Sequence, residues 1–513
     1  MALLKFVFLV VVAQLSLYVG WANSSRDSSA DGVDLTKLQS FSYKPRIFIM
    51  SDILNEPDDS MSLVRYLLYS NEFDTRGICA TTSWWLKNAT HPDEMRKIIN
   101  AYGEVVDNLN KHVNPNASYQ SVEELLALIT SGPAVYGHAA LDLPVSEGAK
   151  RIISALQESE EPLFITGWGG TNTLAQALLH MDKTLSSAEA AKLRSRIRLY
   201  TISDQDDTGA WIRARYPDLF YIVSIHSFNE YQVSTWIGMN LITSPGANST
   251  IVQNPWLDAN IRLGPLGAMY PQIIYGMEGD TPSFLWLVQN GLVYRDRIDW
   301  GTWGGRYSRP EPLVDWTDVY TNHFVDARDS NVIGIDGNSY QTNQATIWRW
   351  RRAYQDDFAA RMRWTLTANF SEVGHPPVLN INGHQGPDPV IVKAKSNETY
   401  TFDAGLTYDP DYPSDNSRLE FQWFLYSEPT FFVSNVTIEA LSPPEGTSGT
   451  LDANDAGFAN VTLGTKVQIT VPESSINPNT GVVNNFHVIL QVTNSAGLYP
   501  IRRYQRLVFE YEN

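Results

Sequence analysis

The stretch "RIFIMSDILNEPDDSMSLVRYLLYS", residues 46–70, decides the fold. Its first six residues are an apolar run typical of a buried strand, and Leu63, Leu67 and Leu68 follow at helical spacing. The run "RGICATTS", residues 76–83, predicts the next strand. Strand, helix and strand in this order predict a βαβ unit with two parallel strands.

The same alternation continues along the chain. Runs at 161–167, 198–204 and 218–224 predict further strands, and residues 171–181 predict a helix. This pattern indicates an α/β domain, over residues 45–373, built on an open and mostly parallel sheet with helices on both faces. A helix rich in Arg and Trp, residues 343–364, is expected near its end.

The composition then changes. Residues 374–388 have the Pro and Gly content of a linker, and residues 389–513 consist of short alternating runs separated by turn-forming residues. This second pattern predicts an all-β, immunoglobulin-like sandwich domain.

The bulk numbers agree with two domains and limit the ligands. A chain of 513 residues is too long for one ordinary core, and 43% apolar residues are enough to build large cores. The net charge of -18 argues against a nucleic-acid partner, because phosphate binding needs clustered Lys and Arg. Sugars and cations fit this charge better.

The N-terminal sequence predicts export. Residues 1–22 combine an early Lys5 with a long apolar run and a small residue, Ala22, before the expected cleavage point, as signal peptides do. A transmembrane anchor is the alternative, but polar residues interrupt the run and no basic flank follows it. Residues 23–44 are expected to form a mobile N-terminal segment, and no membrane partner is expected.

Glycosylation sequons are numerous, and cysteine is rare. Cys79 is the only cysteine, so it cannot form an intramolecular disulfide, and its apolar surroundings predict an inert buried side chain. Eight N-x-[ST] sequons together with an export signal predict a secreted, extracellular glycoprotein carrying N-glycans. The sequon asparagines are Asn23, Asn88, Asn116, Asn248, Asn369, Asn397, Asn435 and Asn460.

Carboxylates are crowded directly after the first strand. Asp52, Glu56, Asp58 and Asp59 fall within eight positions. Like charges this close repel and raise one another's pKa values, so the cluster needs a cation or strong hydrogen-bond donors. The pattern indicates a site for a hard metal ion.

Two later loops carry more oxygen ligands. The stretch "GWGGTNTLA", residues 167–175, follows one predicted strand, and "EGDTPSFLWL", residues 278–287, brings Glu278 and Asp280 before a helix. Each stretch alone could be an ordinary turn or helix cap. Together they offer the oxygen ligands that Ca²⁺ takes from several loops.

These motifs resemble a known family. "DILNEPDDS", "SDQDD" and "EGDTPSFL" look like the secreted cellulose-binding proteins that combine a nucleoside hydrolase-like domain with a C-terminal immunoglobulin-like domain, over roughly residues 44–513. More distantly, the first domain is similar to the nucleoside hydrolases, whose aspartate-rich and G-x-x-T-N motifs bind Ca²⁺ and ribose.

The resemblance implies roles for single residues. Asp52 would be a metal ligand and the general base, and Asp58 and Asn172 would bind sugar hydroxyls. The other implied Ca²⁺ ligands are Asp59, Asp280 and the backbone carbonyl of Thr171.

The sequence also departs from the nucleoside hydrolases. Glu56 stands where that family has no carboxylate, and Gly279 stands where many of its members place a His that assists the leaving group. Glu56, Asp206 and Asp207 are therefore all candidates for the acid that protonates the leaving group. We predict that Glu56 and Asp52 are the catalytic residues.

Tryptophans near the predicted strand ends are candidates for stacking on a ligand. We predict that Trp84 and Trp168 bind the substrate, and burial in the core is the alternative for each. Trp85, Trp300 and Trp303 share this position and this alternative.

A second Ca²⁺ site is conceivable in the sandwich. The turn "YDPDYPSDN" gathers Asp409, Asp411 and Asp415, and a solvated loop is the commoner outcome for such a turn.

Two functions remain open. The first is a secreted, Ca²⁺-dependent hydrolase of glycosidic or N-ribosyl bonds, acting on a carbohydrate or nucleoside-like substrate. The alternative is a non-catalytic, cellulose- or carbohydrate-binding protein with a degenerate hydrolase pocket. The clustered carboxylates favour the enzyme, whereas Gly279 and the Trp content favour the binding protein.

Overall fold

A computed structural model describes residues 33–240, 246–310, 321–429, 435–442, 457–458, 460–473 and 485–512. The expected signal peptide and the sequon at Asn23 lie outside these residues. Within them, no helix combines the length and the apolar character needed to cross a bilayer.

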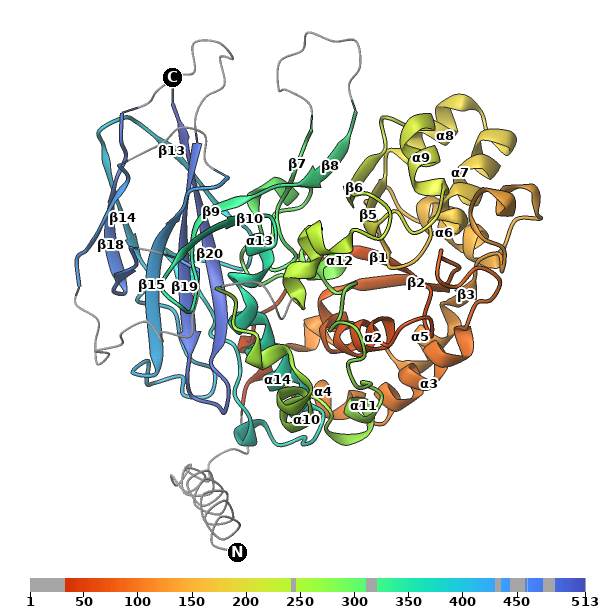
Figure 1. The fold of residues 1–513 in the computed structure, drawn as a ribbon. Helices are drawn as coiled ribbons and strands as arrows, with labels where there is room; N and C mark the ends of the chain where they lie inside the picture. The colour runs from red at the N-terminus through yellow and green to blue at the C-terminus, as the bar shows by residue number, and fades with distance from the viewer. Residues whose placement is uncertain are drawn as a thin grey trace, which may run out of the picture.

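The first domain is built on an eight-stranded sheet (Figure 1). All neighbouring pairs are parallel except the last, β8 with β7. The strands in spatial order are β3 (Ile129–Ser131), β2 (Asp74–Ala80), β1 (Arg46–Ser51), β4 (Leu163–Gly167), β5 (Ile197–Ser203), β6 (Phe220–Ser224), β8 (His323–Asp326) and β7 (Tyr307–Ser308).

Helices cover both faces of this sheet, and a separate hydrophobic core lies under each layer. One layer consists of α6 (Glu147–Gln157), α7 (Asn172–Thr184), α8 (Ser187–Arg194) and α9 (Thr208–Arg215). The other contains α2 (Asp58–Tyr69), α3 (Pro92–Gly103), α4 (Val106–Leu109), α5 (Val122–Ala127), α10 (Asn254–Asn260), α11 (Gly264–Ala268), α12 (Pro282–Leu285) and α14 (Arg351–Trp364). The predicted α/β class is confirmed.

The strand order reverses between β1 and β4, since the chain first winds outward to β3 and then returns to the other side of β1. Ligands of open α/β sheets bind at such a switch point, beyond the carboxyl ends of the strands. The acidic segment after β1 and the glycine-rich segment after β4 both begin here.

The second domain is a β-sandwich, as predicted. One sheet has the order β13 (Val390–Ala394), β20 (Ile501–Tyr511), β19 (Asn485–Asn494), β15 (Leu419–Tyr426) and β17 (Thr462–Leu463). The other has the order β14 (Thr399–Asp403), β18 (Lys466–Thr470) and β16 (Thr437–Ala440). Two small sheets stand apart from these, the hairpins of β9 (Asp329–Ile333) with β10 (Ser339–Thr342) and of β11 (Asn380–Ile381) with β12 (His384–Gln385).

The larger sandwich sheet is covered on both faces. Alternation along β15 sends Trp423 into the sandwich core and sends Phe424 and Tyr426 into the core of the first domain. Figure 1 shows this sheet, in blue, standing against the first domain on the side of α14 and β9. Side chains of this sheet therefore extend the hydrophobic core of the first domain, while the sandwich keeps a core of its own.

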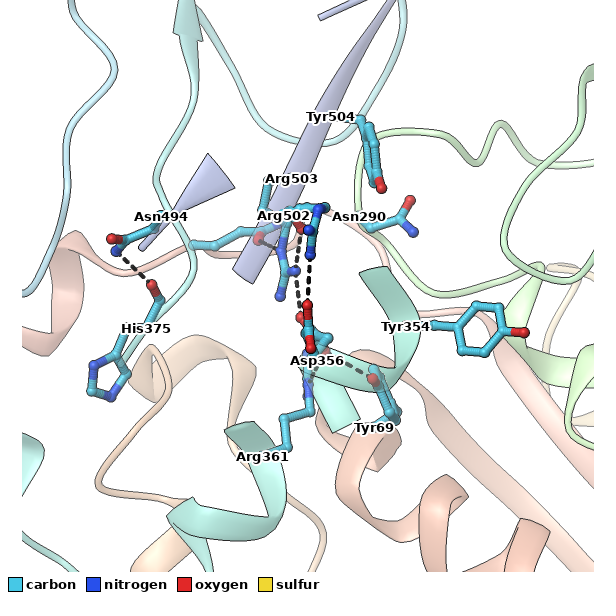
Figure 2. A network of polar contacts seen from close by, with 12 residues as sticks. Tyr69, Asn290, Tyr354, Asp356, Arg361, His375, Asn494, Arg502, Arg503 and Tyr504 are labelled. Carbon is cyan, nitrogen blue, oxygen red and sulfur yellow. Dashed lines mark hydrogen bonds and ion pairs between the residues drawn. The ribbon is translucent and has the colours of Figure 1, made fainter. Parts of the chain in front are cut away.

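Buried ion pairs reinforce this contact. On α14, Asp356 accepts from Arg502 at 2.9 Å and Asp357 accepts from Arg503 at 2.7 Å, and both arginines belong to β20 (Figure 2). Arg361 of α14 pairs with Asp357 and also with Glu72 of the first domain. These residues are called the interface network below. All their side chains are at most 6% exposed, so these ion pairs are buried in the interface and shielded from water.

Two segments differ from the sequence prediction. The helix expected over 343–364 is broken, because α13 (Ala345–Trp348) ends before α14 begins at Arg351. Residues 33–44, expected to be mobile, are held in place, since the Asn114 amide donates to the carbonyls of Thr36 and Leu38. Backbone carbonyls of residues 33–44 thus hold this segment in place, and backbone contacts of this kind cannot be predicted from a polar composition.

Candidate functional site

Three aspartates converge at the switch point. Asp58 and Asp59 form the first turn of α2, and Asp280 lies in the loop before α12. One carboxylate oxygen from each residue lies within 4.8 Å of the others. These three residues are called the aspartate trio below. The long-range approach of the 278–282 loop to α2 is what assembles the trio from two distant segments.

Hydrogen bonds within the protein do not satisfy every carboxylate oxygen of the trio. The Ser51 hydroxyl, at the end of β1, donates to Asp59 Oδ1 at 2.5 Å. Asp280 is only 2% exposed, and its Oδ2 atom has no hydrogen-bond partner. A buried carboxylate oxygen without a partner is costly, so it indicates a missing ligand.

The charge of the site is uncompensated. No Lys or Arg in the described ranges forms an ion pair with any of the five carboxylates of the site, which are Asp52, Glu56 and the aspartate trio. Burial, followed by repulsion from neighbouring carboxylates, raises the pKa of Asp58 to about 7 and the pKa values of Asp59 and Asp280 well above the ordinary range. The donor set fits a divalent cation that prefers oxygen ligands.

Asp52 lies beside the trio, next to the glycine-rich segment. A Cβ atom on Gly169 would come within 2.7 Å of Asp52 Oδ1, so this close approach requires glycine. Burial, and then the charge of Glu56, raises the pKa of Asp52 to about 6. Asp52 is not part of the trio, so its role as a metal ligand stays a prediction.

Glu56 is less enclosed than Asp52. It is half-buried, and partial burial raises its pKa. The preceding Leu54 has a φ of 76°, a left-handed conformation that a non-glycine residue rarely adopts. The turn that presents Glu56 is therefore held in an unfavourable backbone conformation, as is common near functional sites.

The two polar residues after β4 are turned inward. The Thr171 carbonyl accepts the N–H of Ala175 at 2.9 Å and so begins the hydrogen bonds of α7; a calcium role would use its second lone pair and stays a prediction. The Asn172 amide donates to Thr82 Oγ1 and to the Val135 carbonyl, both at 2.8 Å. Asn172 thus ties neighbouring loops together and keeps no amide proton for a sugar, contrary to the sequence interpretation.

Glu278 has a structural role that its sequence position does not show. Its carboxylate pairs with Arg65 of α2 and accepts from the Tyr270 hydroxyl at 2.6 Å. The side chains of Glu278 and Arg65 are both fully buried. This pair fixes the loop that places Asp280, and sequence analysis missed Arg65 because 213 residues separate the two partners.

The candidates for a leaving-group acid separate clearly. Asp206 is buried and accepts from both the backbone and the hydroxyl of Thr208, and from the backbone of Asn172, so it organises the loop. Asp207 is exposed and accepts the His138 N–H at 2.7 Å. Glu56, by contrast, shares the electrostatic environment of Asp52 and the trio.

The predicted tryptophans divide into buried and exposed groups. Trp168 is 1% exposed and donates to the Ser283 hydroxyl at 2.8 Å, so it offers no ring face to a ligand, contrary to its placement in the substrate-binding set. Trp300 and Trp303 are also buried. Trp84 and Trp85 are 38% and 44% exposed, and the Lys87 ammonium covers one face of the Trp84 ring.

Gly279 has an explanation in the structure. A Cβ atom there would lie 2.9 Å from Trp236 Cζ3 and 3.0 Å from Asp58 Oδ2. Trp236, which sequence analysis did not single out, therefore fills the space next to Gly279 and is anchored by its indole N–H to the Ser203 hydroxyl. A larger side chain at position 279 would collide with it.

The aspartate turn of the sandwich does not gather metal ligands. Both oxygens of Asp411 accept from His375, and Asp415 accepts the backbone N–H of Ser417. Asp409 keeps one unpartnered oxygen, but it does not join a group of potential metal ligands in the described residues. The second Ca²⁺ site has no support from this geometry.

Two family models match the chain. The model described as "Cellulose-binding Sde182, nucleoside hydrolase-like domain" matches residues 46–307, just over half of the chain. The chain belongs to the Sde182 family. A second model, described as "Cellulose-binding protein Sde0182, C-terminal domain", matches residues 399–511, so both parts of the expected resemblance are confirmed.

A solved structure supports the Sde182 assignment. It is a nucleoside hydrolase-related hypothetical protein from Saccharophagus degradans that is associated with carbohydrate metabolism. The identity is 26%, the TM-score is 0.71, and the match covers 92% of this chain and 100% of the other. Two endo-fucoidan hydrolase structures of glycoside hydrolase family 107 match with 10% and 9% identity, covering 91% of this chain and 67% of theirs, but their TM-score of 0.16 carries no argument. No curated protein matches the chain.

Proposed function

We propose that the chain is a secreted, Ca²⁺-dependent hydrolase of glycosidic or N-ribosyl bonds with a carbohydrate or nucleoside-like substrate. The observation that carries this proposal is the aspartate trio, whose oxygens lie within 4.8 Å and whose Asp280 keeps a buried oxygen without a partner. Asp58, Asp59 and Asp280 would hold the ion. When bound, Ca²⁺ would act as a Lewis acid at this position.

Asp52 is the proposed general base. A pKa of about 6 leaves it ionised near neutral pH and close enough to that pH to accept a proton efficiently. Because Gly169 has no side chain, the Asp52 carboxylate can lie against its backbone without a steric conflict. Glu56 is the proposed proton donor to the leaving group, because its pKa is raised and it is half-buried at the same site.

A carbohydrate-binding protein without turnover is the second candidate. It is favoured by the packing of Trp236 against Gly279, which leaves no room there for a His that would assist a leaving group. The description of the matched family as cellulose-binding points the same way.

Turnover decides between the two candidates. Wild type should release product from at least one member of a panel of nucleosides, aryl glycosides and plant cell-wall oligosaccharides, measured by chromatography. Asp52→Asn should lower kcat at least about 10²-fold, the scale of a lost general base, while the Ca²⁺ content and melting temperature stay close to wild type. Asp207→Asn is the matched control, because Asp207 is exposed and lies outside the trio.

Two results would contradict the enzyme. Equal rates in wild type and Asp52→Asn would remove Asp52 from the mechanism. No release by wild type, with oligosaccharide binding intact, would establish the binding protein.

Export and N-glycosylation belong to the same proposal. Six of the seven sequon asparagines in the described ranges are exposed, and Asn248 is half-buried, so oligosaccharyl transfer is sterically possible at most of them. Mass spectrometry before and after glycosidase treatment should show a loss of mass and an N-terminus near Asn23. An unshifted mass that includes residues 1–22 would contradict secretion.

A further inference from the structure

An exposed group of aromatic rings lies in the loops after β2 and β6. Phe228, in the loop after β6, is 66% exposed. Its ring contacts Trp84, with centroids 5.0 Å apart, and Trp85, with centroids 6.5 Å apart and planes inclined by 23°. Trp84, Trp85, Phe228 and Tyr231 are called the aromatic rim below.

Backbone hydrogen bonds connect the rim to the catalytic loops. The loop that carries Trp84 and Trp85 follows β2, and its Thr81 N–H donates to the Ser51 carbonyl, immediately before Asp52. The Gly170 N–H, from the loop after β4, donates to the Thr82 carbonyl at 2.9 Å. The rim is thus built on the same strand ends as the carboxylates and is held at a fixed position beside them.

Tyr231 connects the rim to the segment next to the aspartate trio. Its hydroxyl accepts the Trp85 indole N–H at 3.2 Å. The Tyr231 ring also lies beside the Trp236 ring, with centroids 5.9 Å apart, and Trp236 fills the space next to Gly279. Ring contacts therefore connect the rim to the loop that carries Asp280.

The chemistry of the rim selects for a neutral ligand. Lys87, whose ammonium lies 3.4 Å from the centre of the Trp84 ring, is a cation that faces the rim, and the neighbouring site gathers several carboxylates. A polyanion would be repelled by these carboxylates. Exposed aromatic faces next to a polar pocket suit the apolar faces and hydroxyl edges of a sugar ring.

We propose that the aromatic rim is a saccharide subsite, so that the ligand is a neutral sugar chain with one residue next to the site carboxylates and at least one more on the rim. This inference rests on the proposed carbohydrate function but not on turnover. Solitary exposed apolar residues are ordinary, whereas three large exposed rings in mutual contact are typical of a binding surface. A second protein molecule is the competing occupant.

Isothermal titration with glucose and with β-1,4-linked glucose oligomers of two to six residues tests the proposal. Wild type should bind the longer oligomers at least about tenfold more tightly than glucose. The double variant Trp85→Ala/Phe228→Ala should lose that gain and keep the weak affinity for glucose. Both side chains are largely exposed, so the variant is expected to fold.

Three controls keep the result specific. Leu498→Ala removes an apolar side chain that is 60% exposed in the β19–β20 hairpin and should leave every affinity unchanged. Asp52→Asn should keep the dependence on chain length even if turnover is lost, which separates failure of the rim from failure of the proposed chemistry. Sedimentation velocity of wild type and the double variant tests whether the rim joins two copies.

Equal affinity of the double variant and wild type at every chain length would overturn the proposal. So would no binding of any oligomer by wild type, or a dimer that dissociates in the double variant.

Discussion

In the interface network the buried carboxylates face arginines, whereas at the switch point no Lys or Arg of the described residues forms an ion pair with the aspartate trio. Burial alone would raise the pKa of Asp357, but Arg503 and Arg361 hold it below its ordinary value. No such partner faces Asp59, which is 4% exposed and whose pKa is raised well above its ordinary value. Asp357 and Asp59 are thus similarly buried aspartates, but Asp357 has arginine partners within the protein and Asp59 has none in the described part of the chain.

The difference separates stability from function. Carboxylates that are paired inside the chain fix the two domains against each other. Carboxylates whose partner is missing raise the free energy of the folded protein until a cation arrives, so they store the driving force for binding. Four predictions test this contrast, from the largest expected effect to the smallest.

Removing an arginine from the interface network should have the largest effect. Arg361→Leu would leave Glu72 and Asp357 buried without this partner, and breaking a buried pair from one side costs about 3–5 kcal/mol of the free energy of unfolding. Urea unfolding in the presence of a chelator measures the loss. Arg352→Leu, which removes a partner that is 30% exposed, should cost much less, and equal losses would contradict the contrast.

Calcium should stabilise the protein through the trio. At a Ca²⁺ concentration of 100 times the Kd, the free energy of unfolding should rise by about 2.7 kcal/mol. Asp280→Asn should abolish this increase, and Asp411→Asn should retain it because Asp411 lies in the sandwich turn. The melting temperature with and without Ca²⁺ is the measurement. An increase that survives Asp280→Asn would place the ion elsewhere.

The contribution of Asp52 to the free energy of unfolding should fall as the pH rises, as expected for a buried acid without a cationic partner. With chelator present, folded Asp52 has a pKa of about 6 and the unfolded residue has an ordinary pKa near 4, so the folded state binds more protons between these values. The stability of wild type minus that of Asp52→Asn should therefore fall by about 1–3 kcal/mol as the pH rises from about 4 to about 6.

The interface network supplies the control for this experiment. The pKa of Asp357 is lowered, so its contribution is present above the unfolded pKa and is lost only as the pH falls toward the folded value. The difference between wild type and Asp357→Asn should stay flat over the same window. A rising difference for Asp52→Asn would contradict the assigned direction.

Crowding the trio should have the smallest effect. In Gly279→Ala the new methyl would lie 2.9 Å from Trp236 and 3.0 Å from Asp58 Oδ2, so Trp236 must shift and Asp58 must give by a few tenths of an ångström. We expect a loss of about 1 kcal/mol in calcium binding, or roughly fivefold in Kd. Gly405→Ala places a methyl 3.0 Å from Asp403 Oδ1, outside the site, and should leave the Kd unchanged. Equal affinities in both variants would show that Asp58 is not held close to the ion.

The sequence by itself determined the elements whose evidence is local. The β1–α2–β2 unit follows from an apolar run and from leucine spacing, because strand and helix periodicity are properties of neighbouring residues. The crowding of Asp58 and Asp59 is equally local, and by itself it predicts a cation site. By contrast, Arg502, Arg503 and Arg506 make β20 look polar in the sequence, and only the structure shows that this strand is buried.

Only the tertiary structure decided which of two similar residues is structural and which is left open. Glu278 and Asp280 are two positions apart, yet one is neutralised by Arg65 of α2 and the other keeps an unpartnered oxygen toward Asp58 and Asp59. Trp84 and Trp168 both follow strands, yet one is exposed and the other is buried. The reason is physical: a charge or a ring face is defined by what surrounds it, and those neighbours come from segments far away in the chain.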